Sequence, residues 1–225
     1  MTLRKTTSVA PDRRHVAHGP VEAKQHVDLH RKVLMRRNLL RIGVPGAAYV
    51  PYCGDGDIAI ELYRGRRVFA ADIDPNRTAV AASNLPEADI RTADCDEWPF
   101  PGLENEIAIA DFDAYGYPYT AFRAFWANAR KANRLALFFT DGQGLNIEWK
   151  GRWNEPTGEL VTAPGFVQSK DGGDLLYRRR TWSFWFSQHL WPWLITQISP
   201  EWRPIHRFRY IRGIMVYWGA VIERV

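Results

Sequence analysis

The chain has 225 residues, of which 46% are hydrophobic, and a formal net charge of +5 at pH 7. This length accommodates one domain with a sizeable core. The sequence holds no apolar run near the roughly 18–20 residues that cross a bilayer, and no apolar stretch follows residues 1–5. Cys53 and Cys95 match no zinc or disulfide spacing, and His26 and His30 have no third ligand nearby. We therefore expect a cytoplasmic protein with no membrane segment and no metal site.

Basic residues concentrate at the two ends of the sequence. Residues 1–41 hold ten Lys or Arg against three acids, and residues 178–212 hold seven Arg against Glu201 alone. Basic segments around a more acidic centre suit a nucleic-acid substrate. Solvated helix faces and a loose basic tail would give the same pattern. We expect a nucleic-acid partner that binds through these N-terminal and C-terminal segments.

The first half of the chain predicts alternating strands and helices. Residues 1–22 are expected to be a flexible basic tail, and residues 23–225 a single domain. Residues 24–42 predict an amphipathic helix whose apolar stripe includes Val33, Leu34 and Leu39. We expect strands at 47–52, 68–71, 89–92, 107–111 and 134–140, with helices at 58–63, 75–84 and 119–132. This alternation is typical of a parallel sheet that helices cover.

The alternation ends near residue 141. Residues 141–180 are rich in Gly, Pro, Trp and charge, which indicates an insert or a lid. Residues 181–199 predict an aromatic helix bent at Pro192, and residues 204–224 a closing hairpin. The sequence therefore predicts an α/β fold: a doubly wound, Rossmann-like sheet of seven strands, mostly parallel, with one antiparallel strand from the C-terminal hairpin.

A glycine turn follows the first predicted strand. Gly54 and Gly56 allow a sharp turn and close approach of a ligand. Asp72 ends the second strand, where it can accept both hydroxyls of a ribose, and Asp94 follows the third, where it can receive an adenine amino group. The predicted cofactor-binding residues on these segments are Tyr52, Cys53, Gly54, Asp55, Gly56, Asp72, Ile73, Asp94 and Cys95.

Two cofactors compete for this turn. Gly54, Gly56 and Ala59 satisfy the loose nicotinamide fingerprint. However, Asp55 and Asp57 flank a helix N-terminus that would otherwise attract a pyrophosphate. Two carboxylates there suit a cofactor with an ammonium and a sulfonium group, so S-adenosylmethionine is favoured over NAD. A turn without a ligand is the remaining alternative.

The fourth strand ends in Asp111-Phe112-Asp113-Ala114-Tyr115-Gly116. A carboxylate beside an aromatic ring suits an exocyclic amine on a planar ring, because the carboxylate accepts the N–H groups while the aromatic side chain stacks on the ring. The structural alternatives are a turn cap for Asp113 and an acceptor of loop amides for Asp111.

These two segments resemble class I S-adenosylmethionine-dependent methyltransferases. Val50-Pro51-Tyr52-Cys53-Gly54-Asp55-Gly56 looks like the Asp-Pro-Phe-Cys-Gly-Ser-Gly turn of the amino-methylating branch. Asp111-Phe112-Asp113-Ala114-Tyr115-Gly116-Tyr117-Pro118 is similar to the Asp-Leu-Asp-Pro-Phe-Gly-Ser-Pro motif of the tRNA guanine N2-dimethyltransferases. Phe139-Thr140-Asp141 resembles the Thr-Asp that ends the next strand of that family. The resemblance covers about residues 45–145.

The resemblance implies an N-methyltransferase for an exocyclic amine of a nucleic-acid base, with RNA favoured over DNA. It implies that the Asp113 side chain and the Ala114 carbonyl accept the amine N–H groups, and that Tyr115 stacks on the base. Asp111 is a further candidate at both the catalytic and the cofactor end. Val50 and Ala114 stand where the family has an acid and a proline. A small-molecule or protein methyltransferase and a non-catalytic nucleic-acid-binding relative are the alternatives.

Overall fold

The computed structural model describes residues 28–114, 116–143, 151–162, 183–198, 200–212 and 215–225. The predictions for the tail at 1–22, for His26, for Tyr115 and for parts of the insert lie outside these ranges. Five strands of the central sheet run parallel: β1 (Ala47–Pro51), β2 (Val68–Asp72), β3 (Asp89–Thr92), β4 (Ile107–Phe112) and β5 (Lys131–Asp141). A C-terminal hairpin adds β8 (Trp202–Arg212) and β9 (Met215–Arg224).

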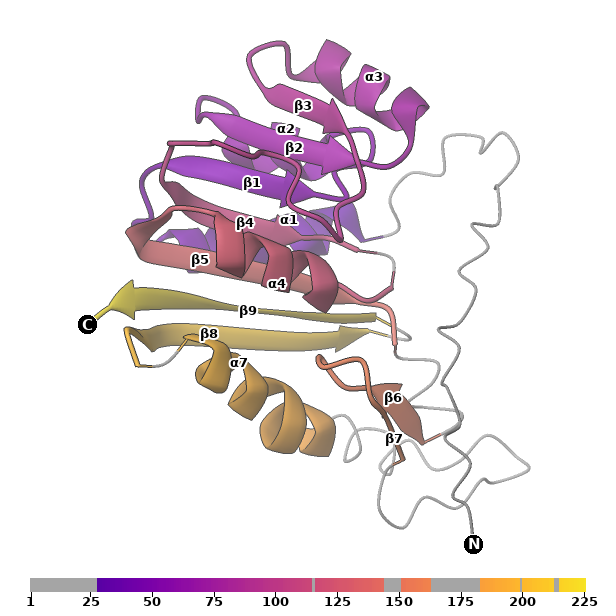
Figure 1. The fold of residues 1–225 in the computed structure, drawn as a ribbon, viewed down its shortest axis with the longest axis vertical. Coiled ribbons are helices and arrows are strands. Elements are labelled where there is room, and N and C mark those ends of the chain that lie inside the picture. Colours follow the sequence, from indigo (N-terminus) through magenta and orange to yellow (C-terminus); the bar gives the residue numbers. More distant parts are fainter. Residues whose placement is uncertain (1–27, 115, 144–150, 163–182, 199, 213–214) are drawn as a thin grey trace, which may run out of the picture.

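The sheet has the order β3-β2-β1-β4-β5-β9-β8 (Figure 1). Strand β9 pairs antiparallel with both β5 and β8, so β9 is the one reversed strand of the seven. The structure therefore confirms the predicted doubly wound, seven-stranded sheet with one antiparallel strand from the C-terminal hairpin. The strand order changes direction at β1, because β2 and β3 lie on one side of it and β4 and β5 on the other. In α/β sheets, ligands bind beyond the carboxyl ends of the strands at such a switch point.

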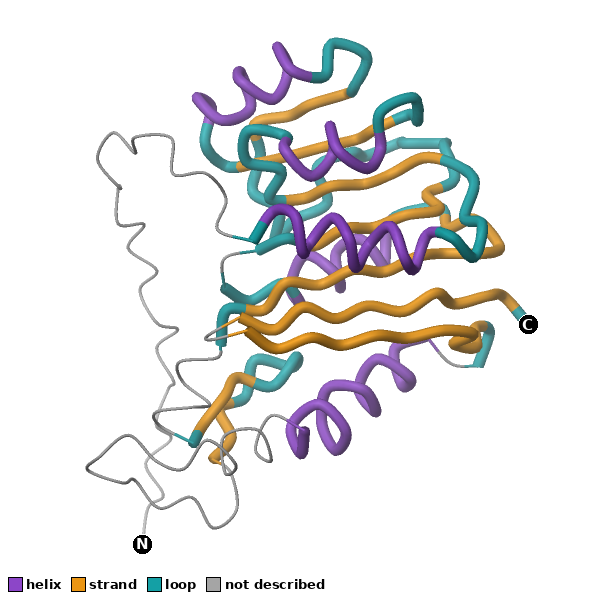
Figure 2. The backbone as a smooth tube through the Cα atoms, turned by 180° about the vertical axis from the view of Figure 1, so that it is seen from behind, coloured by secondary structure: helices purple, strands orange, loops and turns teal. Residues whose placement is uncertain are grey.

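Helices cover both faces of the sheet. One face carries α1 (Leu29–Leu40) and α2 (Asp57–Tyr63), with α3 (Pro75–Asn84) beside β2 and β3 (Figure 2). The other face carries α4 (Tyr119–Asn128), a π-helical turn η1 (Phe186–Leu190) and α7 (Trp191–Ile198) (Figure 1). None of the helices in the described ranges has the length and apolar character needed to cross a membrane.

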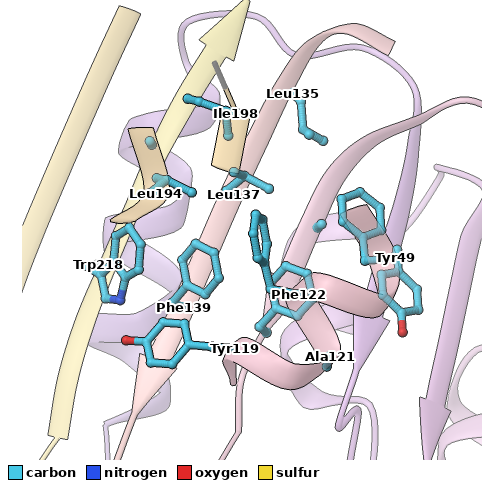
Figure 3. Close-up of a cluster of buried hydrophobic side chains, with 14 of the residues drawn as sticks. Tyr49, Tyr119, Ala121, Phe122, Leu135, Leu137, Phe139, Leu194, Ile198 and Trp218 are labelled. Carbon is cyan, nitrogen blue, oxygen red and sulfur yellow. The ribbon is translucent and has the colours of Figure 1, made fainter. Parts of the chain in front are cut away.

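Alternate strand residues build two hydrophobic cores. Tyr49 and Phe139 point to the α4 face, whereas Ala48 and Phe138 point to the α1 face, as the period of a strand requires. The α4 side is strongly aromatic: Trp218 stacks on Phe139 with ring centroids 4.2 Å apart (Figure 3). These packed rings fix the positions of β4 and β5, whose ends carry the site.

The largest differences between the predicted elements and the structure concern three segments. Helix α4 ends at Asn128 instead of residue 132, because β5 begins at Lys131 and pairs with Ile107. The insert contains a short antiparallel hairpin, β6 (Arg152–Asn154) and β7 (Leu160–Thr162). In the predicted aromatic helix, the π-turn η1 precedes Pro192, whose missing N–H removes one helical hydrogen bond.

Candidate active site

The predicted site residues meet at one edge of the sheet. Because β1, β2, β3 and β4 are parallel, their carboxyl ends all lie at the same edge. The segments that follow these ends carry Gly54, Asp72, Asp94 and Asp113. The topology therefore brings together the predicted cofactor residues and the predicted amine site, which are about 60 residues apart in sequence at their extremes.

The turn after β1 is tightly wound and is anchored to Asp72. Tyr52, Gly54 and Gly56 all have positive φ angles, of 57°, 54° and 89°. The Gly54 N–H donates to Asp72 Oδ2 at 2.9 Å, and the Asp74 N–H donates to Asp72 Oδ1 at 3.0 Å. Each carboxylate oxygen still has acceptor capacity, so the Asp72 side chain is fixed without being saturated. It can accept hydroxyl groups from a ligand.

Exposed side chains flank this anchored carboxylate. Ile73 and Asp94 are exposed next to Asp72, and Asp55 is exposed on the glycine turn. Asp94 Oδ1 accepts the Asp96 N–H at 2.9 Å, which fixes the loop after β3. The arrangement leaves an open polar and apolar surface at the ends of β2 and β3.

The thiols of Cys53 and Cys95 are half-buried and buried, respectively, and their predicted contacts with a cofactor stay predictions. Cys95 is buried, and its Sγ accepts the Tyr52 N–H at 3.3 Å. Burial raises the pKa of both Cys53 and Cys95 to about 12, so both thiols are protonated at neutral pH and neither is a nucleophile. The described residues also contain no cluster of three His, Cys, Asp or Glu placed to hold a metal ion.

Asp111 forms a buried ion pair with α1. Arg36 Nε and Nη2 each lie 2.7 Å from one oxygen of the Asp111 carboxylate, and the Tyr63 hydroxyl donates to Oδ2 at 2.6 Å. The Asp111 side chain has no exposed surface. Its catalytic and cofactor-binding roles stay predictions, and both would require Arg36 or Tyr63 to share this carboxylate.

Asp113 lies two residues after Asp111, directly after the end of β4. Lys32 Nζ donates to Oδ1 at 2.8 Å and to Oδ2 at 2.7 Å, and the Thr140 hydroxyl donates to Oδ1. Burial by itself would raise the pKa of Asp113, but the charges of Lys32 and Arg36 and the bonds from Lys32 and Thr140 hold it below the usual value. Asp113 is therefore an ionised hydrogen-bond acceptor at neutral pH. Ala114 beside it is buried.

Sequence reasoning missed the cations on α1. We expected Leu34 in the buried stripe, but 47% of its surface is exposed, while Lys32 and Arg36 are buried. The two basic residues are four apart and therefore share one face of the helix. That spacing was the only signal in the sequence, because the carboxylates that bind them lie at the distant end of β4, at Asp111 and Asp113. The expected stripe was thus wrong at Leu34, and Val33 and Leu39 are buried as expected.

Asp141 at the end of β5 is a second buried carboxylate. The Tyr119 hydroxyl donates to its Oδ2 at 2.7 Å, and the Gln143 N–H donates to its Oδ1 at 2.8 Å. Figure 3 shows the side chain of Tyr119. Gln143 also bonds to the Asn154 backbone and so ties β6 to the sheet. Burial raises the pKa of Asp141 to about 6, although the bonds from Tyr119 and Gln143 act in the opposite direction.

This pKa predicts a specific pH dependence of stability. The native state binds more protons than the unfolded state between about pH 4 and pH 6, so the free energy of unfolding falls as the pH rises through that window. Near pH 5 the slope contributed by Asp141 is about −1 kcal/mol per pH unit. Urea unfolding of the wild type and of Asp141→Asn at several pH values should show this difference in slope. Parallel curves would contradict the assignment.

Comparisons with known proteins agree with the fold. No family model and no curated protein matches the sequence. The N-methyltransferase NodS of Bradyrhizobium japonicum WM9, in complex with S-adenosyl-L-homocysteine, superposes with a TM-score of 0.52 at 12% identity, over 87% of this chain and 86% of that one. The plantazolicin methyltransferase BpumL, also in complex with S-adenosyl-L-homocysteine, gives a TM-score of 0.52 at 12% identity, over 88% and 87% of the two chains.

A third similar structure is the putative methyltransferase yhhF of Escherichia coli. Its TM-score is 0.50 at 11% identity, over 92% of this chain and 91% of that one. At sequence identities of 11–12%, the structural similarity shows a shared fold and no more. The chain therefore has the fold of class I S-adenosylmethionine-dependent methyltransferases, along nearly its whole length.

Proposed function

We propose that this protein is an S-adenosylmethionine-dependent N-methyltransferase whose acceptor is an exocyclic amine of a nucleic-acid base, with RNA favoured over DNA. One observation carries the proposal. The anchored turn at Gly54 and Asp72 shares a sheet edge with the ionised carboxylate of Asp113. A methyl donor held by the first and an amine held by the second would meet at the end of β4.

The residues at this edge fit the cofactor. Asp72 would accept the ribose hydroxyls, because both oxygens are fixed and keep acceptor capacity. The exposed Asp94 would receive the adenine amino group, with Ile73 against the ring. Bound S-adenosylmethionine supplies an electrophilic methyl group on its sulfonium. The protein has to orient an amine toward that group.

Asp113 would orient the amine. Its carboxylate can accept an N–H group and so aim the nitrogen lone pair at the methyl group. Its negative charge would also stabilise the positive charge that develops on the nitrogen. The next residue is Ala114, and we propose that its backbone carbonyl accepts the second N–H group of the amine. Asp113 and Ala114 would therefore act by positioning and electrostatics, without forming a covalent bond to the substrate.

Exposed arginines support a polyanionic substrate. On β8, Arg203, Arg207 and Arg209 are exposed. The guanidinium of Arg207 lies 4.7 Å from the ring centroid of Trp191, and that of Arg209 lies 5.2 Å from the ring centroid of Phe186. Stacking on these rings holds the arginines in place while their N–H groups can still bind phosphates.

The proposal is tested by nucleoside analysis. Unmodified tRNA transcripts and single-stranded DNA are incubated with the protein and S-adenosylmethionine, digested, and analysed by mass spectrometry. The expected result is an N-methylated nucleoside from RNA that needs both protein and cofactor. Methylation of a protein or small-molecule acceptor with none on either nucleic acid would overturn the choice of substrate.

One observation favours a second candidate, a non-catalytic nucleic-acid-binding relative. Lys32 contacts both oxygens of Asp113, so the carboxylate is already engaged. This candidate predicts salt-sensitive binding of tRNA with no methyl transfer under any condition. Turnover with any nucleic acid would exclude it.

Replacement of Asp72 provides a test of the cofactor site. Asp72→Ala is expected to weaken S-adenosylmethionine binding about 10- to 100-fold, because it removes charge-assisted bonds to the ribose. Calorimetric titration gives the affinity directly. The variant Asp74→Asn, which changes the neighbouring half-exposed carboxylate, serves as the control and is expected to keep the wild-type affinity. Equal affinities for wild type and Asp72→Ala would remove Asp72 from the site.

A further inference from the structure

The side chain of Lys32 lies in an enclosure that is suited to an ammonium ion. Its Nζ donates to both oxygens of Asp113, at 2.8 and 2.7 Å, and lies 5.7 Å from the ring centroid of Tyr217. Only 6% of the Lys32 side chain and 8% of the Asp113 side chain are exposed. A carboxylate and an aromatic face are the two groups that bind ammonium cations best. The ammonium group of Lys32 thus occupies the position beside Asp113 in which an ammonium ligand would bind.

The charges at the end of β4 are balanced. Asp111 is paired with Arg36 through two bonds, and Asp113 is paired with Lys32. Two carboxylates therefore face two cations in a region between the end of β4 and α1 where all four side chains are almost fully buried. An additional cation at Asp113 would meet Lys32 at short range in this region, where like charges repel strongly.

Asp113 nevertheless keeps hydrogen-bond acceptor capacity for a neutral donor. Its Oδ1 receives bonds from Lys32, Arg36 and Thr140. Among the residues that the structure describes, Oδ2 receives only the Lys32 bond. A carboxylate oxygen can accept two hydrogen bonds, so an N–H group can be accepted at Oδ2 without displacing Lys32.

We propose that Lys32 fills an ammonium subsite and thereby restricts the acceptor of this site to a neutral amine. The inference rests on the proposed function and defines its substrate class more closely. Exocyclic amines of nucleobases are neutral at pH 7, whereas alkyl amines such as the lysine side chain have pKa values near 10 and are charged. A charged acceptor would have to displace Lys32, and a neutral one would not.

Proton transfer points in the same direction. In each methylation an N–C bond would form as the S–C bond of the sulfonium breaks, S-adenosylhomocysteine would leave as a neutral thioether, and the nitrogen would lose one proton. An alkylammonium has to lose its proton before it can attack, and an Asp113 whose pKa is held low is a poor base for that step. A neutral aromatic amine attacks first and becomes strongly acidic afterwards, so Asp113 Oδ2 or water can take its proton. Lys32 is therefore a specificity-determining residue, not a catalytic one.

The direct test is ligand binding to a variant that lacks the internal ammonium. Lys32→Ala should bind n-butylammonium at least about tenfold more tightly than the wild type, because the subsite is emptied and the local charge becomes negative. Calorimetry measures this without any turnover. The control ligand is neutral n-butanol, which Lys32→Ala should bind no more tightly than the wild type does. The control variants are Arg31→Ala on the same helix and the double variant Lys32→Ala with Asp113→Asn, and neither should gain affinity for n-butylammonium. Equal binding of n-butylammonium by the wild type and Lys32→Ala would overturn the inference.

A second measurement uses the wild-type chain, in case Lys32→Ala does not fold. Acetic anhydride should acetylate Lys32 much more slowly in the wild type than in the urea-unfolded protein, as read by peptide mass spectrometry. Equal rates would overturn the subsite. In transfer assays, the wild type should methylate no putrescine, and turnover of putrescine comparable to that of RNA would also contradict the inference. If Lys32→Ala gains n-butylammonium binding but the wild type does not methylate RNA, the proposed function is rejected while the ammonium subsite is supported.

Discussion

Asp113→Asn is expected to reduce methyl transfer by about 10²- to 10⁴-fold while leaving S-adenosylmethionine affinity nearly unchanged. The amide keeps the shape of the side chain but loses the negative charge that would accept the amine N–H and stabilise the developing cation. The cofactor contacts that we propose come from other strands, at Asp72 and Asp94. Single-turnover kinetics measure the transfer step, and calorimetry measures the affinity.

The substitution also leaves the buried ammonium of Lys32 without its partner, so stability has to be separated from catalysis. The double variant Lys32→Gln with Asp113→Asn removes both charges together and is expected to recover much of the unfolding free energy, because a buried pair can be replaced at little net cost. It should not recover methyl transfer. Recovery of turnover in the double variant would mean that Asp113 is not the acceptor of the amine.

Arg36→Met is expected to destabilise the fold by about 3–5 kcal/mol, the largest stability effect that we predict. The variant leaves the Asp111 carboxylate fully buried without a counter-ion, although the Tyr63 hydroxyl still donates to it. Met has a similar length, so the loss of packing is small. Urea unfolding at pH 7 measures the change in the free energy of unfolding.

Arg37→Met provides a matched control one residue away on the same helix. Arg37 pairs with Glu61 at 3.1 Å, but both side chains are about half exposed. An exposed pair of this kind contributes less than about 1 kcal/mol. Similar losses for the two variants would show that burial of the Arg36–Asp111 pair is not the source of the stability.

The sheet could be predicted because its strands are buried and end in recognisable residues. Runs such as 68–71 and 107–110 are short and apolar, and each is followed by an acid or a turn, so the strands themselves were visible in the sequence. The β6–β7 hairpin in the insert was not predicted, because each of its strands has only three residues. The π-turn before Pro192 was not predicted either. A helical pattern with a proline predicts that the helix bends, but it does not predict a π-helical turn.

The site was only half visible for a related reason. Gly54, Asp72 and Asp113 lie at strand ends, and a parallel sheet brings strand ends together whatever the rest of the chain does. Lys32 and Arg36 pair with carboxylates 81 and 75 residues further along the chain. No periodicity within α1 carries that information, so the sequence placed both cations in a basic segment expected to bind a nucleic acid, with solvated helix faces as the alternative.

The most direct test of the account is calorimetric titration of the purified protein with S-adenosylmethionine, with NAD as the control. The fold, the turn at Gly54 and the carboxylates at Asp72 and Asp94 predict micromolar binding of S-adenosylmethionine and none of NAD. Binding of NAD in its place, or of neither compound, would contradict the cofactor site from which the proposed methyl transfer is derived.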